Sequence, residues 1–178
     1  MKPTWLGRLL AAAIVVGLTV SVASADEAAT HASAKLTGFQ EAPPKLTNGM
    51  GTFSATVQGT SLTYKLTYSG LSTDAFMAHI HFAQPAVNGG IFLWLCGSAM
   101  APGPAGTPNC PPGGGTVTRT ITAADIVTIT PDQGVAAGDF AGAVRILQSG
   151  DAYVNVHTIR FPAGEIRGQV HTSGEGSG

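Results

Sequence analysis

Between residues 34 and 171 the chain consists of short runs in which apolar and polar side chains alternate. Each run is bounded by Gly, Asn, Pro or Asp, and this combination is typical of β-strands that bury one face. The tripeptide Gln58-Gly59-Thr60 predicts a tight turn, since glycine readily adopts the positive φ that hairpin turns require. The pattern predicts eight strands, at residues 34–37, 51–57, 61–68, 75–82, 90–95, 116–121, 152–158 and 165–171.

Two segments depart from this alternation and predict short helices. Thr122 is a suitable N-cap for a helix over residues 123–127, and Asp139 is a suitable N-cap for one over residues 140–148. The apolar residues of the second segment fall on one helix face: Phe140, Val144 and Leu147. We therefore expect an all-β protein, either a Greek-key or immunoglobulin-like β-sandwich or a flattened barrel, with one or two short helices.

The composition supports a single β-rich domain. The chain has 178 residues, of which 44% are hydrophobic and 11% are charged, and its formal net charge is -1. The charged fraction is less than half of the roughly 25% that is usual in soluble domains, which argues against a coiled coil. The charge balance also gives no reason to expect a nucleic-acid partner.

The N-terminus has the layout of an export signal. Lys2 and Arg8 precede an apolar run over residues 9–22, which ends in the small residues Ala23-Ser24-Ala25. This pattern predicts a signal peptide over residues 1–25 and a domain over residues 26–171, located in the periplasm or outside the cell. The apolar run is shorter than the ~20 residues of a membrane span, so we expect no span after cleavage. Residues 172–178, rich in Gly and Ser, are expected to form a flexible tail.

Export changes the interpretation of the two cysteines. Cys96 and Cys110 flank a segment rich in Gly, Pro and Ala that has no regular pattern. In an oxidising compartment the pair is expected to form a disulfide that holds this segment as a loop. Metal ligation and a redox role are the alternatives, although the Cys-x-x-Cys spacing is absent from the sequence.

Three of the five histidines carry the candidate chemistry. Residues two apart on a strand share a face, so His79 and His81 are expected to project side by side. His157 lies on another predicted strand, on the same face as Tyr153 and Asn155. These histidines predict a transition-metal site for copper, with zinc as the alternative. The alternative is that each histidine is a hydrogen-bonded side chain with a purely structural role.

Further polar residues extend this candidate site. Met77 shares the parity of the histidine pair, and its soft sulfur would favour copper, although packing is the simpler role. The last predicted strand places a polar row on one face: Glu165, Arg167, Gln169 and His171. His171 is a candidate fourth ligand, and Glu165 either orients a ligating imidazole or pairs with a cation. The expected supporting residues around the ligands are Glu165, Arg167, Asn155 and Tyr153.

Five segments carry a resemblance to a known family: residues 36–44 (LTGFQEAPP), 78–81 (AHIH), 88–89 (NG), 150–158 (GDAYVNVHT) and 161–169 (FPAGEIRGQ). Together they resemble the CHRD domain, named after chordin, over residues 34–170. The resemblance implies an exported β-sandwich module, single in many bacteria and repeated in chordin, without a settled activity. The His-x-His strand is also locally similar to the copper-binding strand of Cu/Zn superoxide dismutase. That likeness does not extend to the rest of the dismutase zinc site.

Three functions follow, in order of preference. The first is an exported protein that binds copper or zinc through His79, His81 and His157. The second is a structural or protein-binding module without a metal, whose partner the sequence does not name. The third is a dismutase-like copper enzyme in which Arg167 steers an anion. Enzymatic activity is not favoured, and a homo-oligomer that shares the site between copies also fits the ligand set.

Overall fold

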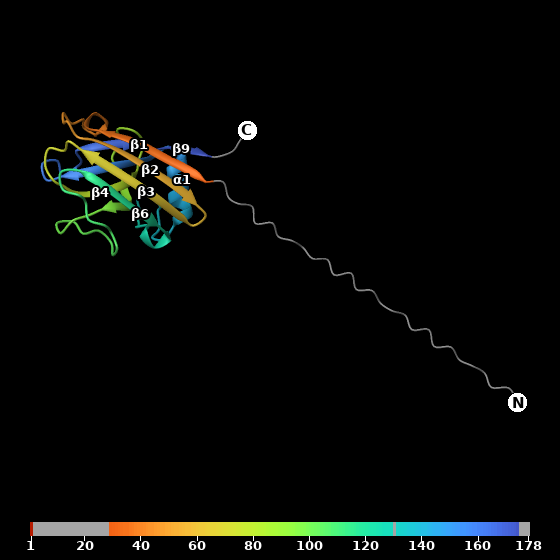
Figure 1. Cartoon of the computed structure of the whole chain (residues 1–178). Coiled ribbons are helices and arrows are strands. Elements are labelled where there is room, and N and C mark those ends of the chain that lie inside the picture. The colour runs from red at the N-terminus through yellow and green to blue at the C-terminus, as the bar shows by residue number, and fades with distance from the viewer. Residues whose placement is uncertain (2–28, 130, 175–178) are drawn as a thin grey trace.

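The structure is a computed structural model that describes residue 1 and residues 29–129 and 131–174 (Figure 1). The expected signal peptide therefore lies, apart from Met1, outside the described residues, as do residues 175–178. None of the helices in the described part of the chain has the length and apolar character that a membrane crossing requires.

Nine strands of the described chain form one sheet whose neighbouring strands are all antiparallel. They are β1 (Thr30–Thr37), β2 (Met50–Gln58), β3 (Ser61–Ser69), β4 (Ala75–Phe82), β5 (Gly90–Cys96), β6 (Gly115–Ile121), β7 (Ala152–Thr158), β8 (Ile166–Gln169) and β9 (His171–Gly174). Their order in the sheet is β5-β4-β7-β8-β1-β2-β3-β6, and β9 pairs with β1.

The sheet folds over on itself to form a flattened barrel. Figure 1 shows β1, β2 and β3 side by side in one layer. The other layer contains β5, β4, β7 and β8, and it joins the first where Thr37 of β1 pairs with Arg167 of β8. At the opposite side Leu93 of β5 forms a bridge with Ile126, just beyond β6, so the barrel is nearly closed. The expected all-β fold is confirmed.

The core lies between the two layers and follows the predicted alternation. Every second residue of β2 and β3 is buried, as illustrated by Phe53 opposite Leu66 and by Tyr64. The Tyr64 hydroxyl donates a hydrogen bond to the backbone carbonyl of Leu95. This bond satisfies the one polar atom of an otherwise apolar ring and ties the two layers together.

The strand β7 differs from this scheme because both of its faces are buried. Val154 and Val156 face the core, which leaves Tyr153, Asn155 and His157 on the opposite face. Polar side chains on the outer face of a sheet are usually solvated. Here the loops before β2, before β5 and before β8 cover them, which produces a second, polar interior beside the apolar core.

The predicted turn and the longer predicted helix are confirmed. Gly59, with a φ of 54°, lies in the tight connection between β2 and β3. The helix α1 (Phe140–Ser149) begins after Asp139, whose carboxylate accepts the Gly142 N–H at 2.8 Å, and it ends at Gly150 with a φ of 80°. The helix expected over residues 123–127 is only the 3₁₀ turn η2 (Ala123–Asp125). A second 3₁₀ turn, η1 (Gly38–Gln40), follows β1.

The last predicted strand is wrong in one respect, because it is broken at Val170. The Val170 side chain is buried in the core and its N–H donates to the Ala152 carbonyl of β7. Before this point β8 pairs with both β7 and β1, and after it β9 pairs with β1. Residues 172–174 therefore belong to β9, although we expected them in the flexible tail. The polar row expected over residues 165–171 does not exist as one continuous face.

The two cysteines form the expected disulfide. Cys96 at the end of β5 is bonded to Cys110, and both residues are buried. The described chain has no free cysteine, so metal ligation by either thiol is excluded. The bonded loop packs back on the sheet, where Gly103 lies against the Trp94 ring so closely that a side chain would not fit.

Candidate metal centre

Pairing between β4 and β7 brings the three candidate histidines together. In this register His79 is opposite Asn155, His81 is opposite Tyr153, and Met77 is opposite His157. Opposite residues of antiparallel strands share a face, so the histidines of both strands project into the same space. Each of the three offers a nitrogen that lies within 4.8 Å of the others, and all three residues are buried.

The spacing suits one metal ion. The ring centroids are 5.0 Å apart between His79 and His157 and 5.5 Å apart between His79 and His81. Two nitrogens that bind one zinc ion at about 2.0–2.1 Å are at most about 4.2 Å apart. The cluster would therefore need only a small contraction of side chains, and no change of fold, to hold an ion.

Backbone carbonyls determine which nitrogen of two rings carries the proton. The Nδ1 atom of His81 lies 3.0 Å from the Gly89 carbonyl oxygen, and Nδ1 of His157 lies 3.0 Å from that of Pro162. A carbonyl oxygen only accepts hydrogen bonds, so both Nδ1 atoms must be protonated. In the neutral rings both Nε2 atoms then carry lone pairs, which is the form that a metal ion needs.

His79 completes the arrangement. Its Nδ1 lies 3.2 Å from Nε2 of His157. Because that Nε2 carries a lone pair and no proton, Nδ1 of His79 is the donor of this hydrogen bond. The remaining Nε2 of His79 and the Nε2 of His81 are buried and have no hydrogen-bond partner. An unsatisfied buried polar atom costs about 1–3 kcal/mol, and such atoms are rare in proteins. The cluster contains two of them, on neighbouring imidazoles.

The electrostatic environment keeps these rings neutral. Burial lowers the pKa of His81 and of His157 to about 4, although the carbonyl bonds partly oppose the shift. Burial and the neighbouring imidazoles lower the pKa of His79 further, to about 2. At neutral pH the site therefore presents three uncharged imidazoles, and no proton has to leave before a cation binds.

Aromatic rings enclose the cluster on two sides. The Trp94 ring packs on His79 at 4.2 Å between centroids, with the two planes at 82°. The Tyr153 ring stacks on His81 at 4.6 Å, with the planes only 3° apart. The Tyr153 hydroxyl also accepts the N–H of Gly89 at 3.3 Å, and the carbonyl of that same residue holds His81. Tyr153 and the Gly89 backbone together therefore fix the position of the His81 ring.

Two expected supporting residues, Arg167 and Asn155, contact neighbours of the histidines and not the imidazoles themselves. The Arg167 guanidinium lies over the outer face of Tyr153, 3.4 Å from the ring centroid, and so extends the stack away from the cluster. Asn155 shares the strand with His157, but its amide donates to the Glu41 carboxylate at 2.6 Å and to the Ile166 carbonyl at 2.9 Å. For both residues, every hydrogen bond and ring contact given by the structure is to a group other than an imidazole.

Glu165 serves a different site altogether. Its carboxylate accepts hydrogen bonds from the hydroxyls of Thr47, Ser72 and Thr158 and from the backbone N–H of Ser72. Burial alone would raise the pKa of this carboxyl, but these hydrogen bonds outweigh burial and lower it. Glu165 lies in the loop before β8 and joins it to the loops around Thr47 and Ser72 and to the end of β7. Neither expected role, orienting an imidazole or pairing with a cation, is therefore observed.

The two less favoured ligand candidates are also placed. His171 is exposed on β9, opposite Ser33 of β1, and it is not part of the histidine cluster. Met77 is half-buried on the histidine face, opposite His157.

Four groups at the site were not predicted from the sequence: the carbonyls of Gly89 and Pro162, the Trp94 ring and the Glu41 carboxylate. Three of them lie in the segments that carry the family resemblance, which was the available signal.

The fold and the cluster define a class: a disulfide-bonded, flattened β-barrel with a buried triad of histidines between two strands. The chain belongs to the CHRD domain family, whose sequence model matches residues 32–170, nearly all of the described barrel. No curated protein and no solved structure matches the chain.

Proposed function

We propose that this CHRD domain protein is an exported metal-binding protein whose ligands are His79, His81 and His157. The observation that carries the proposal is the pair of buried Nε2 atoms without hydrogen-bond partners, beside a third imidazole nitrogen 3.2 Å from His79. The disulfide fits an oxidising compartment, the periplasm or the exterior of the cell.

Copper is the favoured ion, and zinc is the alternative. Imidazole suits both ions, and in the affinity series of divalent metals copper exceeds zinc for the same nitrogen ligands. Met77 lies on the histidine face of β4, opposite His157 of β7, and so places a soft thioether sulfur on the same side of the sheet as the three imidazoles. A bound ion would leave at least one coordination position for water or a small ligand, and it would supply redox or Lewis-acid chemistry there.

The test separates loss of a ligand nitrogen from loss of structure. Asn can imitate the Nδ1–H donor of histidine, so the double variant His81→Asn, His157→Asn keeps the bonds to the Gly89 and Pro162 carbonyls but removes two ligand atoms. We expect one equivalent of copper or zinc per parent chain by elemental analysis, and less than a tenth of that in the double variant. The matched control is His171→Asn, which changes an exposed histidine and is expected to keep full occupancy.

A competing protein-binding function predicts a different result. If the parent chain takes up no copper or zinc after exposure to either ion, the histidines are structural and the metal proposal is wrong. If copper is taken up, electron paramagnetic resonance of the copper-loaded parent is an independent readout, because three imidazole ligands produce nitrogen hyperfine structure.

The dismutase-like alternative receives no support from Arg167, because this side chain stacks on Tyr153 on the side away from His81.

A further inference from the structure

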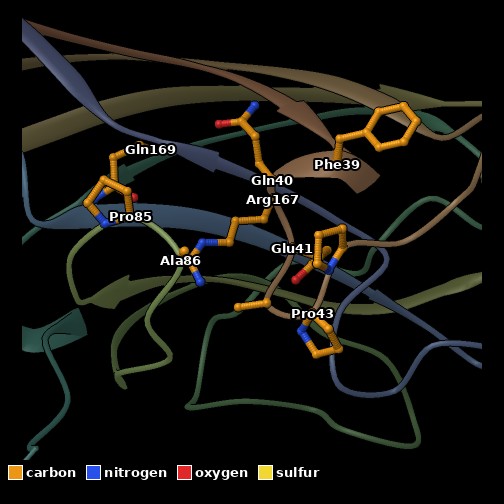
Figure 2. A pocket seen from close by; sticks show the side chains of 10 residues that line it. Phe39, Gln40, Glu41, Pro43, Pro85, Ala86, Arg167 and Gln169 are labelled. Atoms are coloured by element: carbon orange, nitrogen blue, oxygen red, sulfur yellow. The ribbon is translucent and has the colours of Figure 1, made fainter.

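A second recess lies beside the metal centre, on the outer side of the Tyr153–Arg167 stack. It is a cavity of about 500 Å³ between the segment after β1 and the segment after β4. This volume is within the range of small-molecule sites in proteins. Figure 2 shows Arg167 and Glu41 among the side chains that line it, together with Phe39, Pro43, Pro85 and Ala86.

Arg167 is an unusual residue for such a position. It is only 1% exposed, and its guanidinium donates to the Gln84 carbonyl at 3.0 Å and more weakly to Asn88 at 3.4 Å. A guanidinium has five N–H donors, so most of its hydrogen-bonding capacity is unused by the described residues. No carboxylate of the described chain forms an ion pair with it, although a buried charge is costly unless it is paired.

The nearest compensating charge is Glu41, which lines the same cavity and is 5% exposed. One carboxylate oxygen accepts the Asn155 amide at 2.6 Å. Glu41 and Arg167 influence the pKa of one another, yet they are not within 4.0 Å and form no direct ion pair. Opposite charges that line one cavity without touching leave room for a ligand that carries both complementary charges.

The rest of the lining is mainly apolar. It consists of three prolines, Ala42, Ala86 and Phe39, which is 69% exposed, together with the two amide side chains Gln40 and Gln169. Pro85 and Ala86 occupy the middle of a turn closed by a bond from Val87 N–H to the Gln84 carbonyl. Ala86 has a φ of 61°, a conformation that costs a residue with a side chain of the order of 1 kcal/mol or more. This turn also supplies the carbonyl that holds Arg167.

We propose that this cavity binds the zwitterionic head of an α-amino acid with an apolar side chain. The α-carboxylate would pair with Arg167, the α-ammonium would pair with Glu41, and the apolar side chain would lie against the prolines and Phe39. Both protein charges are satisfied at once by such a head group, whereas a simple carboxylate leaves Glu41 unpaired and a simple amine leaves Arg167 unpaired. This site does not depend on a metal being bound to the histidines.

Three matched probes test the proposal by isothermal titration calorimetry on the exported protein, both free of metal and loaded with copper. They are L-leucine, 4-methylpentanoate, which lacks the amine, and 3-methylbutylamine, which lacks the carboxylate. We expect saturable binding of L-leucine and at least tenfold weaker binding of the two analogues. Glu41→Gln retains the oxygen that accepts from Asn155 but removes the charge, so it is expected to weaken L-leucine at least tenfold.

The control variant is Asp132→Asn, which removes a carboxylate from an exposed turn and should leave L-leucine binding unchanged. The proposal is overturned if L-leucine does not bind. It is also overturned if the analogues bind as tightly as L-leucine, or if Glu41→Gln has no effect on L-leucine. Because the measurement is made with and without copper, failure of the histidine site and failure of this cavity give different results.

Discussion

At the scale of single residues, the backbone carbonyls of Gly89 and Pro162 are as important as the histidines themselves. Each one holds the proton on Nδ1 of its partner, so that Nε2 faces the cluster as a lone pair. An imidazole with the other tautomer would direct an N–H at the metal position and repel an ion. Two backbone carbonyls, and no side chain, therefore fix the tautomers of these two rings.

The buried histidines predict how the metal-free protein responds to pH. The pKa of His81 and of His157 is lowered to about 4 in the folded protein, against about 6.5 in the unfolded chain. Below pH 6.5 the unfolded chain binds more protons, so stability is full above that pH and is lost as the pH falls towards 4. Glu41, whose pKa is raised by burial to about 6, opposes this trend by a smaller amount.

Chemical denaturation between pH 7.5 and 4 measures this dependence. We expect the free energy of unfolding of the metal-free parent to decrease by a few kcal/mol across the range. The variant His81→Asn, His157→Asn should show a shallower decrease, because two of the three responsible groups are gone. Equal slopes for parent and variant would contradict the assignment of the pH dependence to these rings.

Glu165 predicts a loss of stability without a loss of metal. In Glu165→Gln an N–H₂ group replaces an acceptor oxygen that faces the donors of Thr47, Ser72 and Thr158. Hydrogen bonds to a charged group contribute about 1.5–3 kcal/mol each, so the variant should lose at least about 2 kcal/mol of unfolding free energy. Urea titration checks the stability, and elemental analysis should find unchanged metal content. A variant that loses its metal while still folded would restore Glu165 to the metal site.

At the scale of elements, the strand pairing converts local patterns into a site. His79 and His81 share a face because of the period of two along β4, which is visible in the sequence. Their meeting with His157 depends on the antiparallel pairing of β4 with β7, in which residue 79 is opposite residue 155. A register shift by one residue would turn His157 into the apolar core, so the buried valines of β7 protect the site.

The disulfide loop predicts a measurable stabilisation. The bond between Cys96 and Cys110 closes a loop at a sequence separation of 14, and closing a loop of this size contributes about 3 kcal/mol by restricting the unfolded chain. The double variant Cys96→Ala, Cys110→Ala should lose about this amount in denaturant titration. Reduction of the parent protein serves as the control and should produce a similar loss, and a loss below about 1 kcal/mol would show that the loop is held by its packing.

At the scale of the whole molecule, the barrel has two interiors with different chemistry. The apolar core between the layers stabilises the fold, while the polar interior outside β4, β7 and β8 contains the histidine triad, Tyr153 and Arg167. The loops that cover this second interior connect three pairs of neighbouring strands, β1 with β2, β4 with β5 and β7 with β8. A ligand there stabilises the folded state selectively, because the unfolded chain has no assembled site.

Metal binding is therefore expected to raise the melting temperature. A ligand at a hundred times its dissociation constant adds about 2.7 kcal/mol, which corresponds to about 5–10 °C for a domain of this size. Differential scanning calorimetry with copper and with zinc measures the shift in the parent chain. The variant His81→Asn, His157→Asn should show none, and His171→Asn should show the full shift. A shift that survives in the double variant would place the metal elsewhere.

The sequence by itself determined the strands up to β7, the tight turn at Gly59, helix α1, the cysteine pair and the shared face of His79 and His81. All of these follow from periods and residue preferences that act over a few neighbouring positions. Only the tertiary structure decided the break at Val170, the true partners of Glu165 and the carbonyls that orient the imidazoles. The Glu165 partners Thr47 and Ser72 lie on segments distant along the chain, and the carbonyls of Gly89 and Pro162 reach their histidines only through the course of irregular loops. Periods and residue preferences over a few neighbouring positions determine neither of these.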